Sequence, residues 1–340
     1  MALCTFQSFP DPLPWTIQLA ETLPYSADWK SRLQNAPGLS GWELMKLDAD
    51  LGTHIGEQVK KWLTDHQLKP GLIASHGHTV FHEPGSNFTT QIGSGAHIVA
   101  ASGVDTITSF RSSDVAHGGQ GAPFAPVADM HLFSGYQGYL NLGGIANVTL
   151  QDVSGEWKAW DIGPCNQALN FLAEKTGQAY DRDGKIAAAG VIHSMIVEDL
   201  ISMYPVPGVK VKSLSNAAVL SSWIAYLGKS GLPVADLLAS VTTAIAQLVH
   251  HHISSSTRLP ANILVTGGGA HHPVLVNHLK RLGEPIELTY QLPQPIVIDY
   301  KESLLMAYLG YLTMHHVPYG IYRLTGAAFD SIGGAYHMAK

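Results

Sequence analysis

Apolar residues recur at helical spacing early in the chain. Between positions 41 and 68 they stand three or four residues apart among polar residues, at Leu44, Leu47, Leu51, Ile55, Val59 and Leu63. This spacing gathers the apolar side chains on one face of a helix. The pattern therefore predicts an amphipathic helix from Gly41 to Leu68, which Pro70 ends.

The same order of helix and then strand recurs along the chain. A short apolar strand, Leu72–Ser75, follows the first helix and runs into His76-Gly77-His78. Further strands are predicted at Tyr139–Leu142, Ala146–Leu150, Lys158–Asp161 and Asn262–Thr266, and further helices at Asn166–Thr176, Val234–His252, His272–Arg281 and Glu302–His315. The alternation predicts an α/β fold with parallel strands. Residues 204–216 are expected to form an exposed loop.

Length and composition narrow the class of protein. A chain of 340 residues fits about two domains. Its net charge of −6 gives no basic patch for nucleic acid or an anionic membrane, so a small-molecule partner is expected. No apolar run is long enough for a transmembrane helix, and the first twenty residues do not resemble a signal peptide. Two widely separated cysteines, Cys4 and Cys165, indicate a reduced, cytoplasmic protein.

Four glycine-rich segments follow or join predicted strands, where backbone N–H groups can approach an anion. They are Arg111–Pro123, Asn141–Asn147, Trp160–Asn166 and Val265–Ala270. Each has a structural explanation, since a glycine pair in a hairpin serves the turn itself. Asp161 is either the N-cap of the helix that follows or a general base.

Histidines suggest a metal site as an alternative. His76, His78 and His82 lie close together in sequence, but Glu83 is the only other ligand at suitable spacing, so no metal-binding residue is predicted. His250–His252 and His271–His272 fall at predicted helix ends, where exposure is expected. The chain also lacks the Walker A, dinucleotide-binding and nucleophile-elbow motifs.

Taken together, the motifs resemble the anhydro-N-acetylmuramic acid kinase family, whose fold is the two-lobed actin/hexokinase-like (ribonuclease H-like) α/β fold with an interlobe cleft. The matching segments are Ser75–Pro84, Gln91–Gly93, Phe110–Arg111 with Asp114, Gly118–Pro123, Asn141–Asn147, Asp161–Pro164 with Asn166, Gly267–Gly269, Lys301–Ser303 and Thr325–Ala327. The similarity runs from about residue 40 to the C-terminus.

The resemblance implies a reaction, its cofactors, and which lobe binds the sugar and which the nucleotide. The family transfers the γ-phosphate of ATP to O6 of 1,6-anhydro-N-acetylmuramic acid and opens the anhydro bridge, giving N-acetylmuramic acid 6-phosphate for cell-wall recycling and amino sugar metabolism. ATP and Mg²⁺ are the implied cofactors. Residues 1–128 with 318–340 would form the lobe on the sugar side, and residues 129–317 the lobe on the nucleotide side. Whether the chain forms a homodimer stays open.

The resemblance also implies roles for particular residues. Asp161 matches the family's catalytic aspartate. The implied sugar-binding residues are Arg111, Glu302, His76 and Thr79, with the guanidinium suited to the lactyl carboxylate. The residues implied to bind the nucleotide and its phosphates are Gly143, Gly144, Gly163, Gly267, Gly268 and Gly269.

Three departures from the family pattern accompany these matches. The family opens with a strand and a Ser-Gly-Thr-Ser-x-Asp-Gly turn, whereas Ala2–Phe6 resembles the strand after that turn, so the phosphate-binding turn is expected to be absent. Lys212–Ala218 lacks the family's glycine and glutamate, and Ser94 stands where aspartate is common. The sequence therefore leaves two alternatives to an active kinase: a catalytically inactive sugar- or nucleotide-binding remnant, and a histidine-based metal hydrolase.

Overall fold

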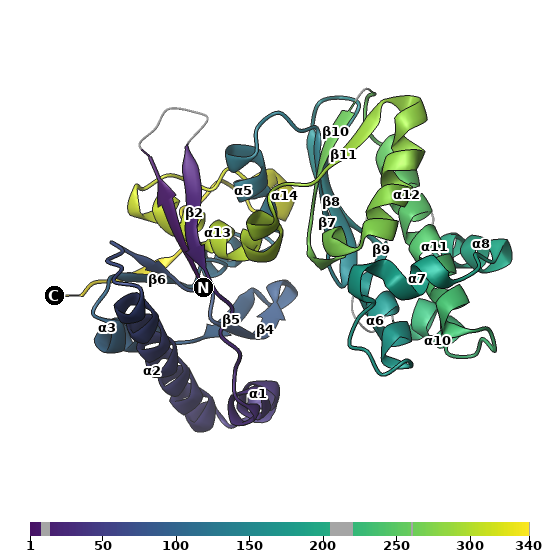
Figure 1. Ribbon diagram of the computed structural model, residues 1–340. Helices are drawn as coiled ribbons and strands as arrows, with labels where there is room; N and C mark the ends of the chain where they lie inside the picture. Colours follow the sequence, from purple (N-terminus) through teal and green to yellow (C-terminus); the bar gives the residue numbers. More distant parts are fainter. Residues whose placement is uncertain (8–13, 205–219, 260, 340) are drawn as a thin grey trace. The chain divides into compact units, whose positions relative to one another are not determined.

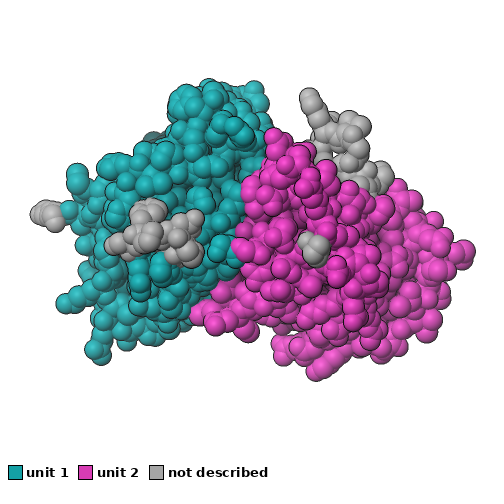
Figure 2. Space-filling model, turned by 90° about the horizontal axis from the view of Figure 1, so that it is seen from above, with its two compact units in different colours: residues 1–134, 300–340 teal, residues 135–299 magenta. Residues whose placement is uncertain are grey.

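The computed structural model describes residues 1–7, 14–204, 220–259 and 261–339. It divides into two compact units, which Figure 2 colours separately: unit 1 is Met1–Ser134 with Tyr300–Lys340, and unit 2 is Gly135–Asp299. Apart from residue 204, the predicted loop at 204–216 lies outside the described residues, as does the motif Lys212–Ala218. No helix in the described part of the chain is both long enough and apolar enough to cross a membrane.

Unit 2 is built on one mixed five-stranded sheet in the order β11-β10-β7-β8-β9. Strands β11, β10 and β7 are parallel, and β8 runs antiparallel to β7 and β9. The strands are β7 (Gly138–Leu142), β8 (Ile145–Gln151), β9 (Trp157–Pro164), β10 (Ala261–Thr266) and β11 (Leu288–Gln291). The carboxyl ends of β7, β9 and β10 consequently meet at one edge of the sheet.

Helices cover one face of this sheet, as Figure 1 shows for α7, α11 and α12. The unit 2 helices are α6 (Asn166–Glu174), α7 (Lys185–Ala189), α8 (Ser194–Ser202), α10 (Ala225–Leu227), α11 (Val234–Ser254) and α12 (Pro273–Gly283). The core between them and the sheet includes Leu140, Val148 and Ile162 from the strands and Val241 and Ile245 from α11. Burial of this apolar surface is the main force that holds the layers together.

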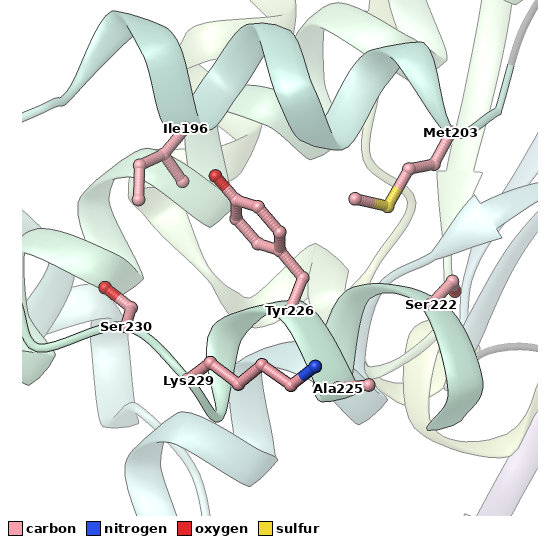
Figure 3. Close-up of a pocket in the computed structure, with 7 residues that line it drawn as sticks. All are labelled: Ile196, Met203, Ser222, Ala225, Tyr226, Lys229 and Ser230. Atoms are coloured by element: carbon pink, nitrogen blue, oxygen red, sulfur yellow. The ribbon is translucent and has the colours of Figure 1, made fainter.

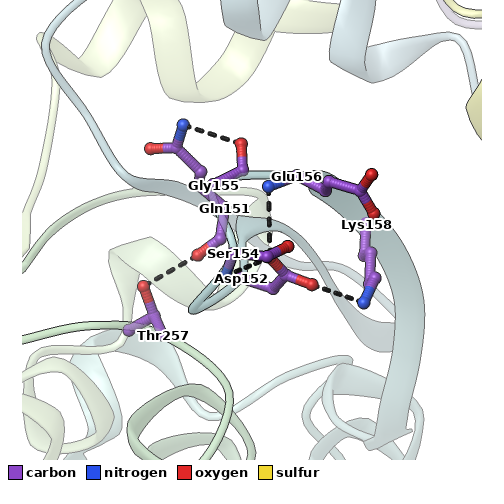
Figure 4. Close-up of polar contacts among 7 residues, drawn as sticks. All are labelled: Gln151, Asp152, Ser154, Gly155, Glu156, Lys158 and Thr257. Atoms are coloured by element: carbon purple, nitrogen blue, oxygen red, sulfur yellow. Dashed lines mark hydrogen bonds and ion pairs between the residues drawn. The ribbon is translucent and has the colours of Figure 1, made fainter.

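The turn between β8 and β9 is fixed by Asp152 (Figure 4). Its carboxylate accepts hydrogen bonds from the backbone N–H groups of Ser154, at 2.8 Å, and Glu156, at 3.1 Å, and forms an ion pair with Lys158. These contacts hold the pKa of Asp152 well below its ordinary value, and the contact with Lys158 has the largest effect. The turn sets the register of β8 against β9 at the end of the sheet opposite to Gly143 and Gly144.

Unit 1 contains three small sheets. β1 (Ala2–Phe6) pairs antiparallel with β2 (Trp15–Ala20), and β4 (His78–Glu83) with β5 (Phe88–Ile92). The third sheet has the order β12-β6-β3, with β3 (Ile73–Ala74), β6 (Thr106–Thr108) and β12 (Ala335–His337).

The longest helix of unit 1, α2 (Gly41–Asp65), packs closely on α3 (Gly95–Ser102). A Cβ atom at Gly52 would lie 2.5 Å from the carbonyl oxygen of Ser94, and one at Gly56 would lie 2.7 Å from that of Ile98. Two glycines spaced one helical turn apart thus let the backbones approach. The other helices are α1 (Ala27–Gln34), α4 (Ser112–Ala116), α5 (Ala125–Leu132), α13 (Pro295–Met314) and α14 (Tyr322–Thr325).

Most of the predicted elements are confirmed, with shifted ends. The helix predicted from Gly41 ends at Asp65 rather than near Pro70, because His66 caps it and Gln67 adopts a left-handed conformation with φ 54°. The helix predicted at Glu302–His315 begins at Pro295 and is broken by non-helical backbone at Tyr300, the residue at which the chain passes from unit 2 to unit 1. Parallel strands are present, but β8 makes the sheet of unit 2 mixed.

Candidate active site

Four polar residues form one row across the sheet of unit 2. The strand register pairs Thr266 with Asn141, Asn141 with Asn147, and Asn147 with Asp161. Directly paired residues point to the same face of a sheet. The row lies near the carboxyl ends of β10, β7 and β9, where glycine-rich loops leave the sheet.

This row occupies the face of the sheet away from the helix-covered core. The residues on either side of Asn141, Leu140 and Leu142, are fully buried in that core, and Asn141 itself is half-buried. Asp161 is likewise half-buried between Trp160, which packs against the core, and Ile162, which belongs to it. The three side chains at positions 141, 147 and 161 are therefore presented together on the opposite face.

Asp161 does not cap the helix that follows it, so that interpretation is wrong. Helix α6 begins at Asn166, and its N-cap is Cys165, four residues beyond Asp161. Asp161 lies inside strand β9, opposite Asn147, at a bulge in the register of β8 and β9. The carboxylate is thereby left on the sheet surface and not at a helix end.

Three loops come together at the carboxyl edge of the sheet. The N–H groups of Cys165 and Asn166 donate to the carbonyl oxygens of Gly144 and Gly143, both at 3.0 Å, and the Asn166 side-chain amide donates to the Leu142 carbonyl oxygen at 2.8 Å. The start of α6 is thus tied to the turn between β7 and β8.

The loop Gly267–Gly269 packs on the same two segments. A Cβ atom at Gly267, where φ is 84°, would lie 2.4 Å from Asn141 Oδ1, and one at Gly269 would lie 2.8 Å from the Leu142 Cβ. Glycine is required here by both backbone conformation and space. Five of the predicted cofactor-binding glycines therefore lie in adjoining loops. The sixth, Gly163, packs against the core, where a Cβ atom on it would lie 2.8 Å from Leu248 Cδ2.

In unit 1, Arg111 and His76 are joined directly. Arg111 Nε donates to His76 Nε2 at 3.0 Å, and Arg111 Nη1 donates to the Gly121 carbonyl oxygen at 2.6 Å. The guanidinium also lies 5.7 Å from the centre of the Phe124 ring. Burial lowers the pKa of Arg111, and the nearby Glu302 carboxylate opposes this effect.

The hydrogen bond from Arg111 determines which ring nitrogen of His76 carries the proton. Because Nε2 accepts a hydrogen bond, the proton of the neutral ring lies on Nδ1, which is 3.3 Å from the Gly77 carbonyl oxygen. Burial, followed by the Arg111 charge, lowers the pKa of His76, while Glu302 raises it. His76 is therefore neutral near pH 7, and Glu302 lies close enough to influence both groups.

Glu302 is exposed on α13, beside a buried ion pair. The neighbouring Lys301 Nζ lies 2.7 Å from Asp129 Oδ1 on α5, with side chains only 11% and 3% exposed. The fourth predicted sugar-binding residue, Thr79, is exposed on β4, where its hydroxyl accepts from the Gln91 amide at 3.4 Å. Unit 1 therefore places His76, Arg111 and Glu302 near one another.

A polar pocket of about 230 Å³ adjoins His76. Its walls come from the segments after β3, β5 and β6, from α2 and from β12, and they include Asp48 and His337. Asp48 Oδ1 accepts from the Gly93 N–H at 2.7 Å, which holds the segment after β5 in place. No lysine or arginine is among the lining residues of this pocket.

A larger pocket of about 560 Å³ lies in unit 2, between α8 and residues 222–230 (Figure 3). Its lining is mainly apolar, with Ile196, Met203 and the Tyr226 ring, and Lys229 is its charged residue. None of the predicted site residues lines it, so we do not place the active site there.

The histidines require one correction. His252 and His272 were expected to be exposed at helix ends, yet they are 2% and 6% exposed. Trp160 Nε1 donates to His252 Nδ1 at 3.2 Å, and His272 caps α12 by accepting from the Leu275 N–H. Among the described residues, no three His, Cys, Asp or Glu side chains are grouped so that they could hold a metal ion.

Asn141 and Asn147 were not singled out as site residues from the sequence. Both flank the Gly143-Gly144 turn, at positions that pair across the hairpin. Their symmetric positions about the glycine pair indicate, from the sequence alone, that the two side chains lie together, because residues paired across a hairpin share one face of the sheet.

Comparison with known proteins gives one consistent result. A family model described as anhydro-N-acetylmuramic acid kinase matches residues 12–339. A protein of that name from Bordetella pertussis (strain Tohama I) is 35% identical over 334 residues, which cover 94% of this chain and 88% of the relative. Another from Synechococcus elongatus is 31% identical over 359 residues, covering 98% of this chain and 94% of the relative.

Solved structures are more distant. The activator of the 2-hydroxyisocaproyl-CoA dehydratase from Clostridium difficile, with bound ADPNP, is 16% identical and superposes with a TM-score of 0.36 over 57% of this chain and 66% of that protein.

Proposed function

Because the chain belongs to the anhydro-N-acetylmuramic acid kinase family, we propose that it phosphorylates 1,6-anhydro-N-acetylmuramic acid at O6 with ATP and opens the anhydro bridge. The match over residues 12–339 carries this proposal. The product would be N-acetylmuramic acid 6-phosphate, and the role would be cell-wall recycling and amino sugar metabolism in the cytoplasm.

The reaction needs one base and one binding site for phosphate. A water oxygen bonds to C1 of the sugar while the C1–O6 bond breaks. O6 bonds to the γ-phosphorus, and the bond from that phosphorus to ADP breaks. The proton lost by the water passes to the base, so ATP, sugar and water give sugar phosphate, ADP and one proton.

Asp161 is the proposed base. Its carboxylate lies on the face of the sheet that the unit 2 helices leave uncovered, in one row with Asn147 and Asn141. Such a position gives a half-buried carboxylate access to a bound reactant, which a general base requires. The neighbouring amides can orient the water or the sugar hydroxyls.

The adjoining glycine loops of unit 2 are proposed to bind ATP. Loops without side chains let backbone N–H groups approach phosphate oxygens, and Gly143–Gly144 and Gly267–Gly269 lie against each other through Asn141 and Leu142. Mg²⁺ binds mainly through phosphates with one or two protein oxygens. The amide oxygens of Asn141 and Asn147 could supply these, and bound Mg²⁺ would neutralise charge on the phosphates.

Unit 1 is proposed to bind the sugar. Arg111, held in orientation by His76 and Gly121, can pair with the lactyl carboxylate. Glu302 can accept hydrogen bonds from sugar hydroxyl groups, and the Thr79 hydroxyl can donate or accept them. The 230 Å³ pocket beside His76 is smaller than the roughly 300–1,000 Å³ typical of sites for whole drug-sized ligands. Its walls contain Asp48 and no lysine or arginine, which favours an uncharged part of the sugar such as the acetamido group.

The comparisons give the alternative of an inactive remnant no support, since the relatives are named as kinases. The proposal is tested by measuring ADP release with MgATP and a panel of sugars. We expect release to require 1,6-anhydro-N-acetylmuramic acid and to be much slower with N-acetylglucosamine. Equal release with every sugar, or with none, would argue against the proposed substrate.

A further inference from the structure

A buried carboxylate, Asp114 in α4, lies behind Arg111. The residue is 6% exposed. Each of its two carboxylate oxygens accepts a hydrogen bond. Thr325 Oγ1 donates to Asp114 Oδ1 at 2.6 Å, and the Gly121 N–H donates to Asp114 Oδ2 at 2.7 Å. These bonds tie the loop after α4 to α14, which lies more than 200 residues later in the chain.

The same loop residue that bonds to Asp114 also holds Arg111. Gly121 donates its N–H to Asp114 and accepts, at its carbonyl oxygen, the 2.6 Å hydrogen bond from Arg111 Nη1. A continuous chain of hydrogen bonds therefore runs from Thr325 through Asp114 and Gly121 to Arg111, and on to His76. The orientation of the guanidinium thus depends on where the carboxylate holds the loop.

The loop has little freedom to make these contacts in another way. A Cβ atom at Gly119 would lie 2.2 Å from Asp114 Oδ2, and Gly121 has φ +62° with its Cβ position 2.6 Å from the Val115 side chain. The Gln120 N–H donates to the Thr325 carbonyl oxygen at 2.8 Å, a second tie between the same segments. Both glycines are therefore needed for the carboxylate to seat the loop.

We propose that Asp114 is a positioning residue that makes unit 1 selective for a sugar bearing a carboxylate. It acts through Gly121 on Arg111 and does not itself touch the sugar. The proposal rests on the proposed function, in which Arg111 binds the lactyl group. Without the carboxylate at position 114, the guanidinium would lose the fixed acceptor that aims its remaining N–H groups.

Substitutions at position 114 separate positioning from catalysis. In Asp114→Asn, the amide oxygen can still accept from the Gly121 N–H, and the amide can donate to Thr325 Oγ1, whose own hydrogen can turn to the Tyr322 carbonyl oxygen 3.3 Å away. Asp114→Ala can make neither bond. If Asp114 only positions Arg111, Asp114→Asn should retain most of the preference for the carboxylate-bearing sugar that Asp114→Ala loses. If the charge of the carboxylate itself were required, both variants should lose that preference.

The experiment measures binding of 1,6-anhydro-N-acetylmuramic acid and of its uncharged lactyl carboxamide, by calorimetry without ATP. The wild-type chain should prefer the carboxylate by about 10- to 100-fold, the range for a charge-assisted hydrogen bond. Asp114→Ala should reduce this preference at least tenfold, and Asp114→Asn should keep most of it. Full preference in Asp114→Ala, or equal loss in both variants, would overturn the proposal.

Asp105 provides a matched control in the same unit. Its carboxylate also accepts one hydroxyl, from Tyr336, and one backbone N–H, from Ala339 at 2.7 Å. Asp105→Ala should leave the carboxylate preference unchanged. A loss of preference in this variant equal to that in Asp114→Ala would show a general effect on folding and would contradict the positioning role.

A second measurement does not depend on the sugar. Labelling of Arg111 by phenylglyoxal, followed by peptide mass analysis, should be slow in the wild-type chain and in Asp105→Ala, and several-fold faster in Asp114→Ala. If the wild-type chain binds neither sugar, the proposed function fails. The positioning of Arg111 is still tested by the labelling, where equal rates in all three proteins would contradict it.

Discussion

Arg111 Nε donates a hydrogen bond to His76 Nε2 at 3.0 Å, so this histidine must be neutral to hold the guanidinium. Burial and the Arg111 charge lower the pKa of His76, and His78 acts in the same direction, whereas Glu302 opposes them. Protonation of His76 would replace the acceptor by a second cation facing Arg111. With Arg111 as the proposed partner of the sugar carboxylate, this pair would link sugar binding to pH.

The affinity for the sugar should fall at acidic pH. Since the pKa of His76 lies below its ordinary value, the loss should begin below about pH 6.5, the ordinary value for histidine, and binding should be complete above it. The pH profile of kcat/KM tests this. In His76→Gln, whose amide oxygen can accept from Arg111 and does not titrate, the acid limb should be flatter. An unchanged limb would assign it to another group.

Replacement of the proposed base should slow turnover without weakening sugar binding. In Asp161→Asn, kcat should fall by about 10²-fold or more while KM changes little, because the amide cannot accept the proton from water. Asp152→Asn, in the turn at the opposite end of the same sheet, serves as the control and should keep its kcat. Unchanged kcat in Asp161→Asn would remove this residue from the mechanism.

Two neighbouring glycines should respond differently to alanine. Gly267 has φ 84° and ψ 164°, a conformation that only glycine adopts readily, and its Cβ would lie 2.4 Å from Asn141 Oδ1. Gly267→Ala should lower the free energy of unfolding by about 1–3 kcal/mol and weaken ATP binding. At Gly268 the nearest atom to a Cβ is Asn166 Nδ2 at 3.3 Å, so Gly268→Ala should be milder.

Denaturant unfolding and nucleotide titration compare these two variants. If Gly268→Ala is as damaging as Gly267→Ala in both measurements, the loop geometry described here does not account for the glycines.

The buried ion pair beside Glu302 should matter for stability. Burial raises the pKa of Asp129, and the Lys301 ammonium opposes that shift. Lys301→Met leaves an unpaired buried carboxylate and should lower the free energy of unfolding by about 3–5 kcal/mol, whereas the double change Lys301→Met with Asp129→Leu should recover much of the loss.

Chemical denaturation of both variants measures the difference. The exposed pair of Lys61 and Asp65, 70% and 52% exposed, provides a control, and Lys61→Met should have little effect. If the double variant is less stable than the single one, the destabilisation comes from lost packing and not from the unpaired charge.

Local patterns were sufficient to predict much of the fold. Six apolar residues at helical spacing predicted α2, and the alternating residues around Gly143-Gly144 predicted β7 and β8. These predictions were possible because the spacing of apolar residues in a helix or a strand can be recognised within a short stretch of sequence. The hairpin of β4 and β5 was not predicted, since His78–Glu83 and Phe88–Ile92 lack a clear apolar alternation and, apart from Ile92, are only partly buried or exposed.

The motifs named candidate site residues but not the contacts between them. Resemblance to a family pointed to Arg111 and His76, yet only the fold shows that they bond to each other. Burial of His252 and His272 depends on Trp160 and on the α12 cap, partners set by tertiary structure and invisible in the local sequence.

The most direct test of the kinase assignment is to incubate the purified chain with MgATP and 1,6-anhydro-N-acetylmuramic acid and to determine the mass of the sugar product. We expect a product that has gained one phosphoryl group and one water, formed together with ADP, and much less of it with Asp161→Asn. A folded wild-type chain that leaves the sugar unchanged, or that releases phosphate from ATP without phosphorylating it, would contradict the account.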